Sequence, residues 1–187
     1  KTIACSPAGS RVVGVAPAAE AFGSAGQASL GIGPDETVVF VVDVVDVQAP
    51  LTPAAWTDGV PTVERDGDGV PTVTLPDTAA PAELQLAVLE EGDGETVITG
   101  DNVTVNYHGL SWEDGETFDE SFTKSAATFN TTGVVKGFGA ALVGQKVGSS
   151  VIVTMPPSLG YGDDPAAHEL GGKTLVFLVD IVDVNAG

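Results

Sequence analysis

Apolar and polar residues alternate along several segments in the C-terminal part of the chain. The segment 102–109 (NVTVNYHG) has apolar residues at every second position from Val103 to Tyr107, which is the pattern of a half-buried strand. Two further runs, 149–156 and 174–184, are rich in β-branched residues and predict two more strands. We therefore expect an antiparallel sheet in this region.

One segment has a helical period instead. At about residues 137–143 apolar residues recur at helical spacing, and Gly144 can take the left-handed conformation that ends helices. The segment 112–119 (WEDGETFD) places an Asp-Gly turn between strand-like flanks. The fold class expected is α+β, with a curved antiparallel sheet over one short helix.

Two blocks of sequence occur twice, in the same order. Residues 9–23 align without gaps to 148–162, an offset of 139 positions (148 − 9). Residues 36–47 align to 173–184 at an offset of 137 (173 − 36), with eight identities in twelve positions. This agreement indicates two copies of one unit. The first copy lacks the counterpart of 82–138, so we expect the chain to begin inside its first domain.

The segment between the copies, 51–81, is dense in Pro, Gly, Asp and Thr and carries GVPTV at both 59–63 and 69–73. This composition is typical of a linker with short extended pieces. ERDGDG at 64–69 lacks the ligand spacing of a calcium loop, so we interpret it as a turn. The domains expected are the C-terminal half of a degenerate copy at 1–50, a linker at 51–81 and a complete domain at 82–187.

Composition and charge narrow the function classes. The chain has 187 residues, 43% of them hydrophobic and 18% charged, which is typical of a globular protein. Seven Lys and Arg against 26 Asp and Glu give a net charge of −19, which disfavours nucleic acid as a partner. Cys5 is the single cysteine and cannot form an internal disulfide. His108 has no second metal ligand at suitable spacing, and neither His108 nor His168 has an evident Ser or Cys partner. No cofactor is expected.

The order of these pieces resembles the FKBP family of peptidyl-prolyl cis-trans isomerases, the immunophilins that bind macrolides. The similar stretches run over about 105 residues, from GDNVTVNYHG through DGETFDES, GVVKGFGAALVGQKVGS and VTMPPSLGYG to KTLVFLVDI. The resemblance implies an FKBP-like fold in which an apolar pocket catalyses rotation about X-Pro bonds. It also implies proline-containing polypeptide clients, macrolides as inhibitors, and no cofactor.

The resemblance also assigns residues to this pocket. The catalytic residues would be Tyr161, Asp119, Phe118 and Val135, and the substrate-binding residues Tyr107, Val134, Phe138, Leu170 and Phe177. The hydroxyl of Tyr161 and the backbone N–H of Val135 would hold the substrate carbonyl. Without the resemblance, aromatic and β-branched residues at this spacing predict ordinary core. A carboxylate after a core Phe needs a hydrogen bond, and we expect Tyr107 to donate one to Asp119.

The chain departs from the family pattern around the pocket. Phe138 stands where Trp often forms the pocket floor. The segment 122–130 is about three residues shorter than usual and lacks the customary Arg, which leaves Lys124 as the nearest basic partner for Asp119. Gly171–Gly172 replace the usual Pro pair, so we expect a more flexible rim.

Three hypotheses follow. The leading one is a prolyl isomerase that assists protein folding, and the alternative is a non-catalytic FKBP-fold module for protein binding or chaperoning. The third, an all-β adhesion-type sandwich, does not explain the helical pattern at 137–143. Tandem copies joined by an acidic linker resemble exported lipoproteins of high-GC Gram-positive bacteria, which implies an extracytoplasmic protein, anchored to the cell envelope or secreted. We expect residues 1–47 to be completed by a separate fragment or a partner strand.

Overall fold

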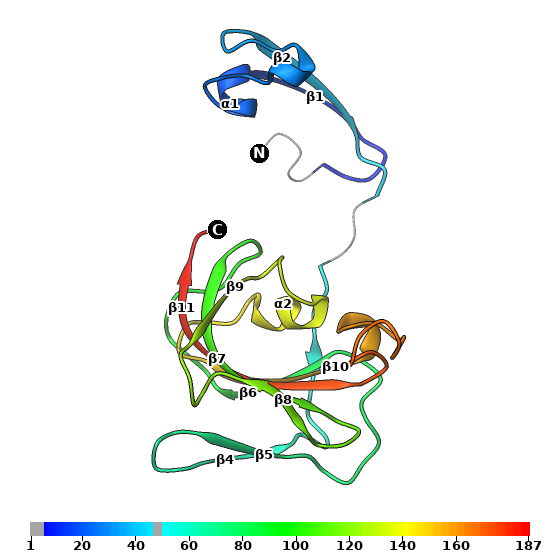
Figure 1. Ribbon diagram of the computed structural model, residues 1–187, viewed down its shortest axis with the longest axis vertical. Coiled ribbons are helices and arrows are strands. Elements are labelled where there is room, and N and C mark those ends of the chain that lie inside the picture. The colour runs from blue at the N-terminus through cyan, green and yellow to red at the C-terminus, as the bar shows by residue number, and fades with distance from the viewer. Residues whose placement is uncertain (1–5, 47–49) are drawn as a thin grey trace. The chain divides into compact units, whose positions relative to one another are not determined.

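The computed structural model describes residues 6–46 and 50–187, which divide into two compact units, Lys1–Ala49 and Pro50–Gly187 (Figure 1). Within the described ranges the second unit holds a seven-stranded sheet and a separate hairpin, and the first unit holds a two-stranded sheet. No helix of the described residues is long and apolar enough to cross a membrane.

The large sheet of the second unit is almost entirely antiparallel. In spatial order its strands are β3 (Ala54–Ala55), β6 (Gln85–Glu90), β10 (Ser150–Met155), β11 (Leu175–Asn185), β7 (Asn102–Ser111) and β8 (Thr117–Glu120), while β9 (Ala127–Asn130) also pairs with β7. Only the short β3–β6 pair is parallel. The strands predicted at 102–109, 149–156 and 174–184 correspond to β7, β10 and β11 and are confirmed.

The sheet curves around the helix α2 (Lys136–Leu142), which confirms the predicted helix and the α+β class (Figure 1). The helix ends before Gly144, which has φ 90, as expected for a helix stop. Gly137 lets the helix lie close to β10, because a Cβ at this position would come within 2.8 Å of Met155. The turn predicted within 112–119 contains Gly115 with φ 68.

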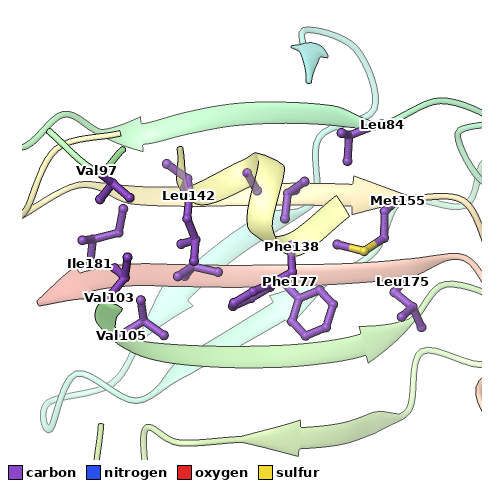
Figure 2. Close-up of a cluster of buried hydrophobic side chains, with 14 of the residues drawn as sticks. Leu84, Val97, Val103, Val105, Phe138, Leu142, Met155, Leu175, Phe177 and Ile181 are labelled. Carbon is purple, nitrogen blue, oxygen red and sulfur yellow. The ribbon is translucent and has the colours of Figure 1, made fainter. Parts of the chain in front are cut away.

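The main core lies between α2 and the face of the sheet that it covers (Figure 2). The helix contributes Phe138 and Leu142 to this core, with 4% and 0% of their surface exposed. Val97, in the segment before β7, and strand residues that are fully buried surround them; the strand residues are Val103, Val105, Val151, Val153, Met155, Leu175 and Val179. Burial of this apolar surface is the main stabilising contribution to the second unit.

The opposite face of the sheet is covered by residues 54–75, which we call the cap. The cap contains β3 and the hairpin of β4 (Thr62–Arg65) and β5 (Pro71–Thr74). Apolar residues of the cap and sheet form a second buried cluster, with Trp56, Ile152, Val176 and Leu178 at its centre and Val60, Val63, Val73 and Leu75 around it. The segment expected as a linker at 51–81 is therefore folded onto the second unit. Alternating apolar positions in the two GVPTV copies give the hairpin an apolar side, which the abundance of turn residues obscured.

The hairpin of the cap turns at Asp66. Its side chain accepts hydrogen bonds of 2.9 Å from the backbone N–H groups of Asp68 and Val70. An Asp that bonds the backbone two residues ahead is a standard turn former. This arrangement matches the turn expected at 64–69.

The first unit consists of a β-hairpin and two short helical turns. Its elements are β1 (Arg11–Pro17), α1 (Ala18–Phe22), the 3-10 turn η1 (Ala28–Leu30) and β2 (Thr37–Asp43). β1 and β2 pair antiparallel, from Arg11 opposite Asp43 to Pro17 opposite Thr37. Several valines of the hairpin are exposed, which contrasts with the buried strands of the second unit.

Candidate active site

A pocket of about 350 Å³ opens beside the start of α2. It is lined by Tyr107, Phe118, Asp119, Phe129, Gly133, Val134, Val135, Phe138, Tyr161 and Phe177. These residues come from β7, β8, β9, β11, the start of the helix and the loop after β10. Segments far apart in the chain therefore build one recess whose lining is mostly aromatic and aliphatic.

Aromatic rings packed edge to face form the floor and walls. Phe138 lies 5.0 Å from Phe177 and 5.7 Å from Phe129, and Phe118 lies 5.4 Å from Phe177, measured between ring centroids. Interplanar angles of 65° to 84° are the geometry that aromatic pairs prefer. The rings thus hold one another in place and leave a rigid apolar surface.

The wall at Phe118 depends on Gly109. A Cβ at Gly109 would lie 2.7 Å from the Phe118 ring and 3.0 Å from the Phe177 ring. Glycine on β7 therefore lets the two rings approach across the strand. A side chain here would displace both rings from the pocket.

A tyrosine and an aspartate meet at the polar edge of the pocket. The hydroxyl of Tyr107 donates a hydrogen bond to Oδ2 of Asp119, as expected from the sequence. Burial, followed by this bond, raises the pKa of Tyr107 well above its ordinary value. Nζ of Lys124 lies 3.7 Å from Oδ1 of Asp119, so Lys124 occupies the role predicted for it. Tyr107 stays a neutral phenol, and its ring is fixed against the pocket.

The two hydrogen-bond donors predicted to hold the substrate carbonyl have no partner among the described residues. The hydroxyl of Tyr161 is one, on a side chain that is 38% exposed. The backbone N–H of Val135 is the other, at the residue that precedes α2. Unpaired donors beside an apolar recess can bind a carbonyl oxygen of a bound peptide.

Eight of the nine residues predicted for the site line this pocket, and Leu170 does not. Leu170 is 7% exposed and belongs to the core, and it borders a different hollow together with Glu169 and Lys173. The loop folds back on itself through the hydrogen bond of 2.8 Å from the N–H of Gly172 to the carbonyl of Gly162, which turns Leu170 inward. Leu170 therefore lies outside this pocket, and its role in substrate binding stays a prediction.

Phe129 and Gly133 line the pocket but were not predicted. Phe129 lies on β9, within the segment 122–130 that we interpreted only as a connection. Alternation along β9 was the available signal, since Thr128 faces Thr104 of β7, at 2.9 Å between hydroxyls, while Phe129 faces the pocket. A four-residue strand is too short for this signal to stand out.

The sequence that builds the pocket matches a known protein family. The sequence model of the family "FKBP-type peptidyl-prolyl cis-trans isomerase" matches residues 94–182. A "Probable FK506-binding protein" of Corynebacterium glutamicum is 34% identical over 113 residues, which cover 60% of this chain and 96% of that protein. The chain belongs to the FKBP-type peptidyl-prolyl cis-trans isomerases. An "FK506-binding protein" of Streptomyces anulatus is also 34% identical, over 61% of this chain and 96% of that protein.

The crystal structure of FkpA from Escherichia coli has the same fold. It superposes with a TM-score of 0.50 and 31% identity, over 70% of this chain and 53% of that one. The chain thus spans about half the length of FkpA. Since the family match and the pocket both lie in the second unit, this unit contains the FKBP-type isomerase domain.

Proposed function

We propose that the pocket beside α2 is the catalytic site of this FKBP-type isomerase. Rotation about an X-Pro bond breaks amide resonance and has a barrier of about 20 kcal/mol. The twisted bond has less charge separation than the planar amide. A recess walled by Phe118, Phe138 and Phe177 therefore binds the twisted form better than the ground state, which is what accelerates the reaction.

The two free donors would hold the substrate backbone during rotation. The hydroxyl of Tyr161 and the N–H of Val135 can each donate to a carbonyl next to the proline. They add orientation and require no covalent step. Tyr107, tied to Asp119, forms a wall of the proline site and places a carboxylate at its rim.

The single observation that carries this proposal is the convergence of eight predicted residues on one apolar recess with free donors. The test measures kcat/KM for cis-trans isomerisation of a proline tetrapeptide. Tyr161→Phe should lower kcat/KM about tenfold, because a hydrogen bond that orients the substrate carbonyl is lost. Ile98→Ala, at a 62% exposed residue outside the pocket, is the matched control. A wild-type protein that gives only the uncatalysed rate would instead favour the non-catalytic binding module.

Family membership implies prolyl peptide substrates and FK506-type binding. The identity of the clients is part of our proposal. We infer that the clients are unfolded chains with exposed X-Pro bonds outside the cytoplasm. The resemblance of the acidic tandem sequence to exported lipoproteins supports this location. Fractionation of cells that express the protein tests it, and recovery in the cytoplasm alone would contradict it.

We further propose that residues 1–50 are the C-terminal half of a degenerate second copy. The strand pairing supports this. Arg11 lies opposite Asp43, and the residues that match them at offsets of 139 and 137, Ser150 and Asp180, also lie opposite each other. The same register continues along both hairpins. Two backbone hydrogen bonds at the open end of each hairpin also correspond. The N–H of residue 9 donates to the carbonyl of residue 44 at 2.7 Å, as the N–H of 148 does to the carbonyl of 181 at 2.8 Å. The N–H of residue 44 donates to the carbonyl of residue 10 at 2.8 Å, as the N–H of 181 does to the carbonyl of 149 at 2.9 Å.

A further inference from the structure

The hairpin of the first unit has one strongly apolar, exposed face. Four side chains form it, which we call the valine face: Val13, Val15, Val39 and Val41, with 60%, 67%, 58% and 61% of their surfaces exposed. They alternate along β1 and β2, so they share one side of the two-stranded sheet. Four aliphatic side chains exposed side by side are typical of a surface that another chain covers.

The second unit shows what covers the equivalent surface. The positions that match the valine face are Ile152, Thr154, Val176 and Leu178, and each is 0% exposed. The cap lies on them, with Trp56, Val63 and Val73 packed in the same cluster as Ile152, Val176 and Leu178. The same strand positions in the same register are therefore buried in one unit and open in the other.

The strand edges differ between the units in the same way. In the second unit β10 pairs with β6 on its outer edge, and β11 pairs with β7. Among the described residues, β1 and β2 pair only with each other. Both outer edges thus present backbone N–H and C=O groups that can accept an added strand.

We infer that the valine face and the open edges of β1 and β2 form a docking surface for the N-terminal part of an FKBP-type fold. The occupant supplies a Trp- and Val-bearing segment like the cap, a strand like β6 along β1 and a strand like β7 along β2. This inference rests on the proposal that residues 1–50 are half of a second copy. It specifies which kind of polypeptide segment covers that half.

The charged corner of this surface needs no basic group from the partner. In the second unit, Arg65 of the cap reaches Asp180 at 2.7 Å. In the first unit the matching acid, Asp43, is already bound by Arg11 on the neighbouring strand, at 2.5 Å. The partner is therefore recognised through apolar side chains and backbone hydrogen bonds.

The test places a second copy of residues 50–147 in front of the first unit. Residues 50–147 are duplicated and joined directly to Gly9, which matches Gly148, so that the junction copies the natural one and the rest of the chain follows. Hydrogen exchange of the backbone amides of β2 is compared between this extended protein and the original chain. We expect exchange to slow by about tenfold or more, because added strands and a cap protect the hairpin.

Matched variants separate docking from general stabilisation. Val13→Asp with Val41→Asp places two charges on the valine face and should abolish the added protection. Val45→Asp, at a residue that is 89% exposed and outside this face, should leave the protection intact.

Unchanged exchange of β2 in the extended protein overturns the inference, as does protection that survives the double variant. Sedimentation of the original chain tests the competing occupant. A dimer that the double variant dissociates would assign the face to a second copy and overturn the inference. Isomerase activity of the original chain depends on the second unit and is measured on that chain, so failure of the catalytic proposal is distinguishable from failure of this inference.

Discussion

The imidazole ring of His168 lies flat against the phenol ring of Tyr161, with centroids 4.2 Å apart and planes within 8° of each other. Nδ1 of His168 also accepts a hydrogen bond of 3.0 Å from the backbone N–H of Leu170. Leu170 is anchored in the core, so the imidazole connects the fixed base of the loop to the exposed tyrosine. His168 therefore restrains the ring of Tyr161, which lines the pocket.

Removing this ring should reduce activity without touching the substrate site. His168→Ala is expected to lower kcat/KM for a proline tetrapeptide about three- to tenfold, because Tyr161 gains rotational freedom. His168→Phe keeps a stacking ring and loses only the bond to Leu170, so it should retain most of the activity. Equal kcat/KM for His168→Ala and the wild type would show that the stack is not needed.

The titration of Tyr107 can be observed separately. The chain has two tyrosines, so Tyr161→Phe leaves Tyr107 as the single phenol, and its ionisation can be followed by ultraviolet absorbance. Burial is the main cause of its raised pKa, and Asp119 adds to it, so the titration should lie above the ordinary value of 10.0. In that background Asp119→Asn should move it only part of the way back. Ionisation at the ordinary value would contradict the buried hydrogen bond.

The raised pKa of Tyr107 also has a defined effect on stability. The folded state holds the phenol proton more tightly than the unfolded state does. This contribution is fully present below the unfolded pKa and is lost as the pH rises from there through the folded pKa. The free energy of unfolding, measured with urea, should therefore fall more steeply above pH 10 in Tyr161→Phe than in the double variant Tyr107→Phe with Tyr161→Phe. If the free energies of unfolding of the two variants fall in parallel with pH, the raised pKa of Tyr107 does not contribute to stability.

The sequence predicted the long elements and most of the pocket. β7, β10, β11 and α2 each carry a sustained apolar period or β-branched run, and eight pocket residues followed from the family resemblance. Phe129 was missed because β9 has only four residues, too few for a period to be recognised. The burial of Leu170 outside the pocket could not be predicted, because its loop has no hydrophobic period and its inward turn depends on tertiary hydrogen bonds.

The cap shows a different limit of sequence interpretation. Its strands are short, and turn residues such as Pro61 and Gly69 dominate the composition. Whether such a hairpin folds depends on the surface that it meets, which here is the apolar outer face of β10 and β11. That face could be identified only once the register of the sheet was known.

One buried hydroxyl has no hydrogen-bond partner among the described residues, that of Thr154 on β10. Burying an unpaired hydroxyl is unfavourable, and valine has nearly the same shape. Thr154→Val should therefore raise the free energy of unfolding by about 1 kcal/mol, measured from urea denaturation. The first unit has Val15 at the matching position. The reverse change on the adjacent core residue, Val153→Thr, should destabilise, and a loss of stability in Thr154→Val would indicate a partner for the hydroxyl.

Trp56 tests whether the cap is part of the isomerase domain. Its side chain is 4% exposed, packs against Trp112 at 6.1 Å between centroids, and donates from Nε1 to the carbonyl of Asp58 at 2.9 Å. Trp56→Ala should lower the free energy of unfolding by about 3–5 kcal/mol, because it opens a cavity beneath the cap. Thr57→Ala, at the exposed neighbour, should have little effect. Since the cap and the pocket lie on opposite faces of the sheet, kcat/KM of the folded Trp56→Ala protein should stay near the wild-type value. A free linker would give no loss of stability, and that result would separate the cap from the domain.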